Sequence, residues 1–453
     1  MLRSLFENSA DLNKATSISL FTRILKRTLH AHEVFFLFPE KFSAILEDSR
    51  GNGRHFLVSK SGRSSWLKHG DNVPLFFDQW KQSIKPACCH FPAIQQLVYA
   101  SYEVSTLFEA LPLPKTSPPS GLLWLHEPEW SICFDSELKT VYLASRISEK
   151  QLDDIACLLA TAGEQSASKK MAVAEIQEVA NDYCYAVKQV KDYICAGDIF
   201  QANIARFWNT ACHKDQLLGL YKHLRRVNPA PFSCFLRADD LSIVSASPER
   251  LFSLSSDGIA EARPIAGTRR RSQGDEDQSL RDELLLSDKE CSEHIMLVDL
   301  ERNDLGRVCE PGSVEVNERM VIEQYATVQH IVSNVRGKLS QDHDVMDLFR
   351  AMFPGGTITG CPKVRCMEII HELEHQARGP YTGSVGYIAF DGSADMNILI
   401  RTFWHDGKQL HWAAGAGIVA DSDPELERIE TEHKVAGLLR ALHANDSTTK
   451  KAG

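Results

Sequence analysis

Helix-like and strand-like stretches are interspersed along most of this chain, and this limits the fold to a mixed class. Apolar residues at three- and four-residue spacing predict helices, whereas alternating β-branched and aromatic residues predict strands. The patterns predict helices at 171–196, 279–304, 364–373 and 424–444, and strands at 199–208, 232–236, 242–245, 251–254, 382–390, 396–404 and 410–417. We therefore expect an α/β or α+β fold.

The first part of the chain has a weaker pattern, with short apolar runs between Gly, Pro and Ser clusters. Such runs predict short strands with irregular connections. The small polar residues at 164–170 are typical of a linker. We therefore divide the chain into an N-terminal region, 1–165, and a second region, 171–445.

Composition excludes several classes of protein. Hydrophobic residues make up 43% of the chain, enough for a sizeable core, so a disordered chain is excluded. Lys and Arg number 50 against 60 Asp and Glu, which argues against a duplex-binding surface. The sequence has neither a membrane-spanning apolar run nor a signal-peptide core, and its cysteines form no Cys-x-x-Cys pair. We expect reduced thiols and a cytoplasmic protein.

Two pairs of glutamates are the first candidates for chemistry. Glu290 and Glu293 are three residues apart, and so are Glu427 and Glu430, so each pair shares one face of its predicted helix. Carboxylates beside an apolar face need a positive partner, and a divalent cation is one candidate. A solvated helix edge, or an acidic start complementing the helix dipole, is the alternative for either pair alone.

Glycine-rich backbone and arginines complete the candidate constellation. The block 353–363 precedes a predicted helix, whose exposed amides suit a carboxylate or phosphate, and 415–417 would allow close approach to the backbone. Arginines at 263–271 and Arg401 can pair with carboxylates, and Glu249 adds one more acid. Each motif taken alone is more often a turn or a solvated loop.

Taken together and in order, these motifs resemble the chorismate-utilising enzymes over roughly residues 185–443. The segments that carry the resemblance are GDIFQANIARFW, SASPERLF, RPIAGTRRR, KECSEHIMLVDLERNDLG, FPGGTITGCPKVRCMEIIHELE, RGPYTGSVGYIAF, ILIRTF and GAGIVADSDPELERIETEHK. The resemblance implies two antiparallel sheets packed face to face with helices outside. It also implies that both regions build one sandwich.

The resemblance also implies a substrate, a cofactor and a set of site residues. The substrate is chorismate, and the cofactor is Mg²⁺ held by Glu290, Glu293, Glu427 and Glu430. Substrate contacts are implied for Gln201, Gly267, Thr268, Tyr381, Arg401, Gly415, Ala416 and Gly417. Catalytic roles are implied for Glu249, His330, Thr357 and Lys363, with Lys363 supporting a substrate carboxylate.

A few positions indicate a branch of the family. Members that add water at C2 carry a lysine base where this chain has Gln201, which disfavours isochorismate and salicylate synthases. The nucleophile is then ammonia from a glutamine amidotransferase partner, since no such domain is recognisable in this chain. The length and the block 354–360 resemble aminodeoxychorismate synthase component I, which forms 4-amino-4-deoxychorismate for p-aminobenzoate and folate.

Ala266 argues the other way. Some aminodeoxychorismate synthases have a nucleophilic lysine at this position, whereas Pro-Ile-Ala-Gly-Thr resembles the anthranilate synthases. For a 4-aminating enzyme we therefore expect ammonia-based chemistry without a lysyl intermediate, with Glu249 managing protons. Two alternatives stay open: anthranilate synthase component I, for tryptophan, and an inactive module that only binds chorismate.

The run 42–50, with Gly53 and Arg54, resembles the stretch that holds tryptophan in both aminating branches. The candidate pocket consists of Glu47, Asp48, Ser49, Pro231, Phe232 and Ser233. A plain strand and turn is the alternative interpretation.

Overall fold

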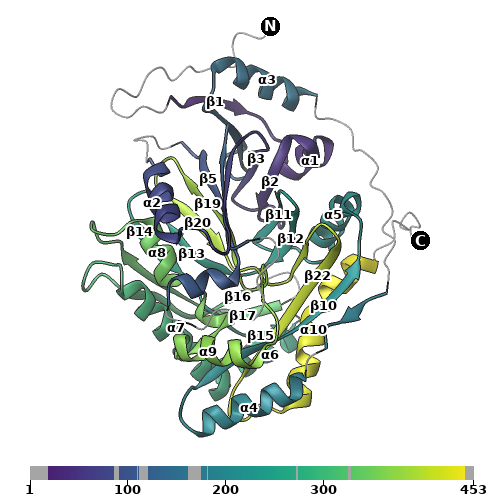
Figure 1. Cartoon of the computed structure of the whole chain (residues 1–453), viewed down its shortest axis with the longest axis vertical. Coiled ribbons are helices and arrows are strands. Elements are labelled where there is room, and N and C mark those ends of the chain that lie inside the picture. Colours follow the sequence, from purple (N-terminus) through teal and green to yellow (C-terminus); the bar gives the residue numbers. More distant parts are fainter. Residues whose placement is uncertain are drawn as a thin grey trace.

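Strands dominate the architecture of the computed structural model (Figure 1). The structure describes residues 19–85, 91–109, 111, 121–161, 175–180, 182–271, 274–324 and 328–443. Every strand pairing among these residues is antiparallel, and the strands form two sheets. No helix in these ranges is long and apolar enough to cross a membrane.

The larger sheet has twelve strands. Their spatial order is β1 (Phe21–Lys26), β8 (Thr140–Ser145), β7 (Trp130–Asp135), β3 (Arg54–Ser59), β2 (Phe42–Glu47), β11 (Phe232–Ala238), β12 (Leu241–Ser247), β21 (Thr402–His405), β22 (Gln409–Ile418), β10 (Gln201–Ala211) and β18 (Gly360–Cys361), with β9 (Gln177–Glu178) also paired to β10.

The second sheet has ten strands. Their order is β15 (Ile265–Arg270), β17 (Val328–Lys338), β14 (Ile259–Ala262), β13 (Arg250–Leu254), β20 (Ala394–Asn397), β19 (Ser384–Ala389), β5 (Ile94–Ala100), β6 (Leu123–Pro128) and β4 (Gly62–Leu67), with β16 (Glu315–Gln324) also paired to β17.

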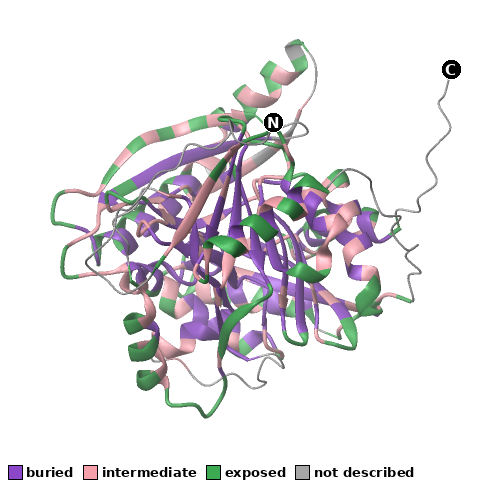
Figure 2. Cartoon of the chain, turned by 90° about the horizontal axis from the view of Figure 1, so that it is seen from above, coloured by how far each residue is buried: buried purple, intermediate pink, exposed green. Residues whose placement is uncertain are grey.

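The two sheets bury a common core. One buried cluster contains Val58 and Ile243 from the larger sheet together with Leu97 and Tyr99 from the smaller one. Figure 2 shows the buried strands at the centre of the molecule, with exposed residues mainly on outer helices and loops. Removing these apolar faces from water is the main force that holds the sheets together. The predicted α+β class, with two antiparallel sheets packed face to face, is confirmed.

Strands from both parts of the chain are hydrogen-bonded within each sheet. In the larger sheet β2 pairs with β11, so that Glu47 faces Ser233, and in the smaller sheet β5 pairs with β19. The proposed linker falls in 162–174, outside the described residues, so the boundary between 1–165 and 171–445 stays a prediction.

Helices cover the outside of the sheets. They are α1 (Ala31–Leu37), α2 (Val73–Ser83), α3 (Glu149–Ala160), α4 (Tyr183–Cys195), α5 (Leu217–Val227), α6 (Asp275–Leu286), α7 (Asp288–Gly306), α8 (Val345–Met352), α9 (Lys363–Leu373) and α10 (Pro424–His443), with 3₁₀ turns η1 (Pro39–Lys41), η2 (Tyr102–Leu107), η3 (Lys214–Gln216) and η4 (Gly356–Ile358). Helix α10 packs against α5, α4 and β22 (Figure 1).

Three predicted elements differ from the structure. The helix predicted at 171–196 begins only at Tyr183, after the Asp182 cap, because the preceding β9 pairs with β10. The helix predicted at 279–304 is two helices, since Ser287 breaks it and caps α7 by accepting a hydrogen bond from the Glu290 amide. The strand predicted at 396–404 is interrupted at 398–401, where Arg401 has a φ of 50°.

Candidate active site

A cavity of about 870 Å³ brings together residues from distant parts of the chain. Its wall is built from β10, β15, β22, η4, α7, α10 and the turns near Glu249, Tyr381 and Arg401. The predicted site residues that line it are Gln201, Glu249, Gly267, Glu290, Glu293, Thr357, Tyr381, Arg401, Gly415, Gly417, Glu427 and Glu430. The two acidic pairs, well over a hundred positions apart in the sequence, therefore face one space.

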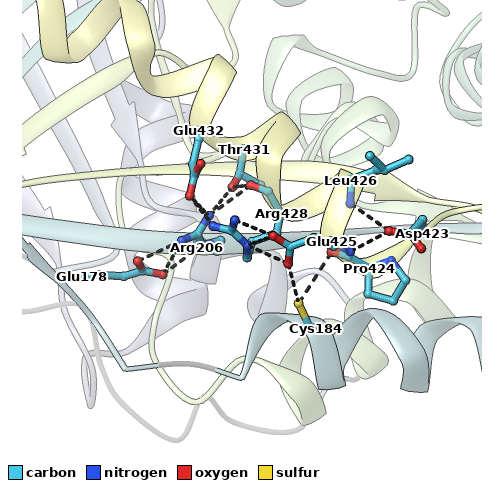
Figure 3. Close-up of polar contacts among 10 residues, drawn as sticks. All are labelled: Glu178, Cys184, Arg206, Asp423, Pro424, Glu425, Leu426, Arg428, Thr431 and Glu432. Atoms are coloured by element: carbon cyan, nitrogen blue, oxygen red, sulfur yellow. Dashed lines mark hydrogen bonds and ion pairs between the residues drawn. The ribbon is translucent and has the colours of Figure 1, made fainter.

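Helix α10 begins at the residue that the sequence predicts. Pro424 is the first helical residue, and Asp423 Oδ1 accepts hydrogen bonds from the amides of Glu425 and Leu426, both at 3.0 Å (Figure 3). Proline fits the first turn because its missing N–H would have no helical partner there. This cap fixes where Glu427 and Glu430 enter the cavity.

Cationic or hydroxyl groups contact Glu290, Glu427 and Glu430. Arg269 donates to Glu290 at 3.1 Å, Lys434 pairs with Glu430 at 2.7 Å, and Ser422 donates to Glu427 at 2.6 Å. Among the described residues no three His, Cys, Asp or Glu side chains gather closely enough to form a metal centre. Four carboxylates on one cavity are nevertheless the ligand type that Mg²⁺ accepts, so the donor set fits once side chains turn toward a common ion.

Glu249 has the most informative ionisation in the cavity. Burial raises the pKa of its carboxyl to about 7, although the Thr357 hydroxyl and the charges of Arg401 and Lys434 oppose the shift. A carboxyl with this pKa is populated in both forms near neutral pH, so it can give or accept a proton. Perturbed acids in clefts are often catalytic.

Strained backbone borders the same wall. Arg401 and Thr382 both have positive φ, 50° and 60°, which is unusual for residues other than glycine and rare for a β-branched one. Thr382 directly follows Tyr381, and its amide donates to the carbonyl of Leu399. The guanidinium of Arg401 lies in a poorly hydrated part of the cavity, and this burial lowers its pKa.

Three glycines of the cavity wall leave room for neighbouring side chains of the same wall. A Cβ on Gly417 would lie 2.1 Å from Nε2 of Gln201, and one on Gly415 would lie 2.9 Å from the hydroxyl of Tyr381. Gly267 has a φ of 58°, and a Cβ there would lie 2.8 Å from Oε2 of Glu290. Glycine at these positions therefore lets three cavity residues lie flat against the backbone.

Four predicted residues lie elsewhere or cannot be placed. Lys363 is not on the cavity wall: its Nζ donates to Asp304 at 2.5 Å and to the carbonyl of Met352 at 3.3 Å, so its ammonium is already engaged. His330 lies behind the wall, with Nδ1 3.3 Å from the carbonyl of Gly267. Ala416 is buried in β22, and the side chain of Thr268 is outside the described part of the structure.

Six polar residues of the wall were not among the predicted site residues: Asn203, Asn228, Arg269, His433, Lys434 and Arg440. Lys434 pairs with Glu430, and its Nζ also donates to the carbonyl of Gly415 at 2.9 Å. Its position four residues after Glu430 was the available signal. Arg269 belongs to the run 263–271, whose arginines were expected to pair with carboxylates, and its contact with Glu290 agrees with that expectation.

A second cavity, of about 560 Å³, lies beside the first. Five of the six predicted tryptophan-pocket residues line it: Glu47, Asp48, Pro231, Phe232 and Ser233. Glu47 accepts hydrogen bonds from Tyr221 at 2.6 Å and Arg225 at 3.0 Å, whereas Ser49 lies off this wall and bonds to Ser233. Ile265 lines both cavities, so one side chain separates them there.

Comparison with known proteins agrees with this geometry. Residues 43–440 match the family described as chorismate binding enzyme. The chain therefore belongs to the chorismate-binding enzymes, and the predicted family is confirmed.

Relatives in this family come from both aminating branches. Aminodeoxychorismate synthase component 1 of Bacillus subtilis is 37% identical over 447 residues, covering 90% of this chain and 93% of the relative. An anthranilate synthase component I-like protein of Synechocystis is 44% identical over 351 residues, covering 76% of this chain and 72% of the relative.

Solved structures share the fold. Anthranilate synthase component I from Streptococcus pneumoniae aligns with a TM-score of 0.77 at 28% identity, covering 85% of this chain and 92% of that one. The menaquinone-specific isochorismate synthase MenF of Escherichia coli aligns with a TM-score of 0.73 at 18% identity, covering 96% and 97%, which shows a common fold.

Proposed function

We propose that this chain aminates chorismate at C4 to give 4-amino-4-deoxychorismate, for p-aminobenzoate and folate synthesis. Ammonia would come from a glutamine amidotransferase partner, and the reaction would take place in the cytoplasm. The observation that carries the proposal is the single cavity in which Glu249, Arg401 and the two acidic pairs meet. The Bacillus subtilis relative, which matches over almost its whole length, supports the 4-amino branch.

Several residues of the cavity have a defined role in this proposal. Arg401 and the Tyr381 hydroxyl would orient the substrate carboxylates over the Gly415–Gly417 backbone. Glu249 would give the proton with which the C4 hydroxyl leaves as water while ammonia replaces it. Glu290, Glu293, Glu427 and Glu430 would hold Mg²⁺, which when bound supplies positive charge to a substrate carboxylate and to the departing oxygen.

Anthranilate synthase component I is the second candidate. Ala266 lines the cavity, so this position offers no amine for a covalent intermediate. The anthranilate synthase of Aquifex aeolicus is 46% identical over 266 residues, although the match covers 58% of this chain and 53% of that protein.

Incubating the chain with chorismate, Mg²⁺ and ammonium, and identifying the product by chromatography, tests the proposal. We expect 4-amino-4-deoxychorismate, which added lyase converts to p-aminobenzoate, and intact mass without a substrate adduct. Anthranilate with pyruvate would favour the second candidate, and unchanged chorismate would favour a binding module. Chelation with EDTA should stop turnover reversibly, and Glu293→Ala or Glu430→Ala should abolish it without unfolding the chain.

The second cavity is proposed to bind tryptophan, on the basis of the five residues that line it. The carboxylates of Glu47 and Asp48, which pair with Arg225 and Arg50 in this structure, would also accept hydrogen bonds from an amino group, and Phe232 offers an apolar surface. Calorimetric titration with L-tryptophan, with L-phenylalanine as the control, should show selective binding. Equal heats from both amino acids would contradict a tryptophan pocket.

A further inference from the structure

We infer that Arg206 is a positioning residue that sets the place of Glu427 and Glu430 relative to the cavity, and thereby the affinity for a divalent cation. This inference deepens the proposed function and rests on its metal assignment. Arg206 lies on β10 and is not part of the cavity wall, so it would act only through α10.

The guanidinium of Arg206 joins three elements. Its Nε and Nη2 donate to the two carboxylate oxygens of Glu178, both at 2.9 Å, in the bidentate geometry that arginine favours (Figure 3). Its Nη1 donates to the carbonyl of Arg428 at 3.1 Å and to Oγ1 of Thr431 at 2.9 Å. Strand β9, strand β10 and the second turn of α10 are thus held by one side chain.

The contacted turn of α10 is the turn that carries the acids. Arg428 directly follows Glu427, and Thr431 directly follows Glu430. The helix face held by Arg206 therefore lies next to the face that lines the cavity. A shift of that turn would move both carboxylates together. Side chains that contact metal ligands without touching the metal fix the orientation of those ligands, and losing such contacts weakens metal binding.

The guanidinium of Arg206 differs from that of its neighbour Arg428 in being buried. Arg206 is 5% exposed, whereas the carboxylates that match its charge, Glu178 and Glu432 at 3.3 Å, are exposed. Arg428, in contrast, forms ion pairs on the exposed side of the same helix with Glu425 and Glu432. Exposed pairs of this kind hold a helix weakly. Arg428 therefore supplies a matched control on the same turn.

Mn²⁺ binding to the full-length chain without substrate, measured by calorimetry, tests the inference. We expect Arg206→Met to raise the Kd for Mn²⁺ at least tenfold and Thr431→Val to raise it two- to threefold. Arg206→Lys should lie between wild type and Arg206→Met, because lysine keeps the charge without the bidentate geometry. Arg428→Met should stay within twofold of wild type. In turnover, Arg206→Lys should raise the KM for the metal while kcat recovers at saturation.

Unchanged Mn²⁺ affinity in a folded Arg206→Met, or an equal loss in Arg428→Met, would overturn the inference and leave the proposed function standing. If Arg206→Met does not fold, the Arg206→Lys and Thr431→Val variants decide in the same way. A wild-type chain that binds no Mn²⁺ would overturn the metal assignment itself, and the inference with it.

Discussion

Glu249 is an acid whose ionisation opposes folding. Its carboxyl keeps a proton up to about pH 7 in the folded chain, against an ordinary value of 4.5. Between these values the folded state binds more protons than the unfolded state, so this group lowers stability as the pH rises through the window. We expect Glu249→Gln to be more stable than wild type at about pH 8, by on the order of 3 kcal/mol.

Urea unfolding at several pH values measures this difference in stability. The difference should vanish near pH 4, where the Glu249 carboxyl is largely protonated in both the folded and the unfolded state. Activity of Glu249→Gln should fall at every pH. A variant that is no more stable than wild type at high pH would show that Glu249 is ionised at little cost.

Gly417 allows a second residue-scale prediction. The backbone would accept alanine, but the new Cβ would displace the Gln201 amide, which would lie 2.1 Å away. Gly417→Ala should therefore lower kcat/KM for chorismate about tenfold, or roughly 1.4 kcal/mol of transition-state binding. Adding Gln201→Ala should remove the clash, so the double variant should resemble Gln201→Ala alone. Additive losses would indicate that the two residues act independently.

At the scale of elements, a buried ion pair joins α9 to the wall. Arg378 and Glu374 are both almost fully buried with their charged atoms 2.7 Å apart, and Arg378 also donates to the carbonyls of Ile358 and Asn203. Its guanidinium stacks on Tyr381, 5.7 Å from the ring centre. The pair therefore connects η4, β10 and Tyr381.

Breaking this pair should be costly. Arg378→Met would leave the Glu374 charge buried without its partner, so we expect a loss of about 3–5 kcal/mol in the free energy of unfolding. The control Arg365→Met removes a half-exposed partner of Glu368 and Asp198 and should cost about 0–1 kcal/mol. Equal losses in denaturant titrations would contradict the structural role of the buried pair.

At the scale of the whole molecule, the two regions complete each other's sheets. Without residues 1–165, β11 would lose β2, β19 would lose β5, and the shared apolar cluster would be open to water. We expect fragments 1–165 and 166–453 to be unfolded alone and to regain cooperative unfolding when expressed together. A second fragment that unfolds cooperatively by itself, followed by circular dichroism, would disprove this dependence.

The sequence could predict those parts of the site that depend on a short stretch of residues. Glutamates three residues apart, a Pro-started helix and glycine-rich turns are local features, and the structure brings them to one cavity. Contacts across long separations could not be predicted this way: Lys363 pairs with Asp304 and Arg206 with Glu178 and α10. Residues 175–180 were predicted as helix but contain β9, which has the same origin, since sheet pairing overrides local propensity.

Helix α10 has a consequence for biogenesis. It follows every other described element in the chain, yet it supplies two of the four acids of the cavity. A chain emerging from the ribosome would thus assemble the strands and α7 first and close the cavity only when α10 docks. A nascent polypeptide would remain incapable of turnover until α10 has left the ribosome, however well its sheets have already formed.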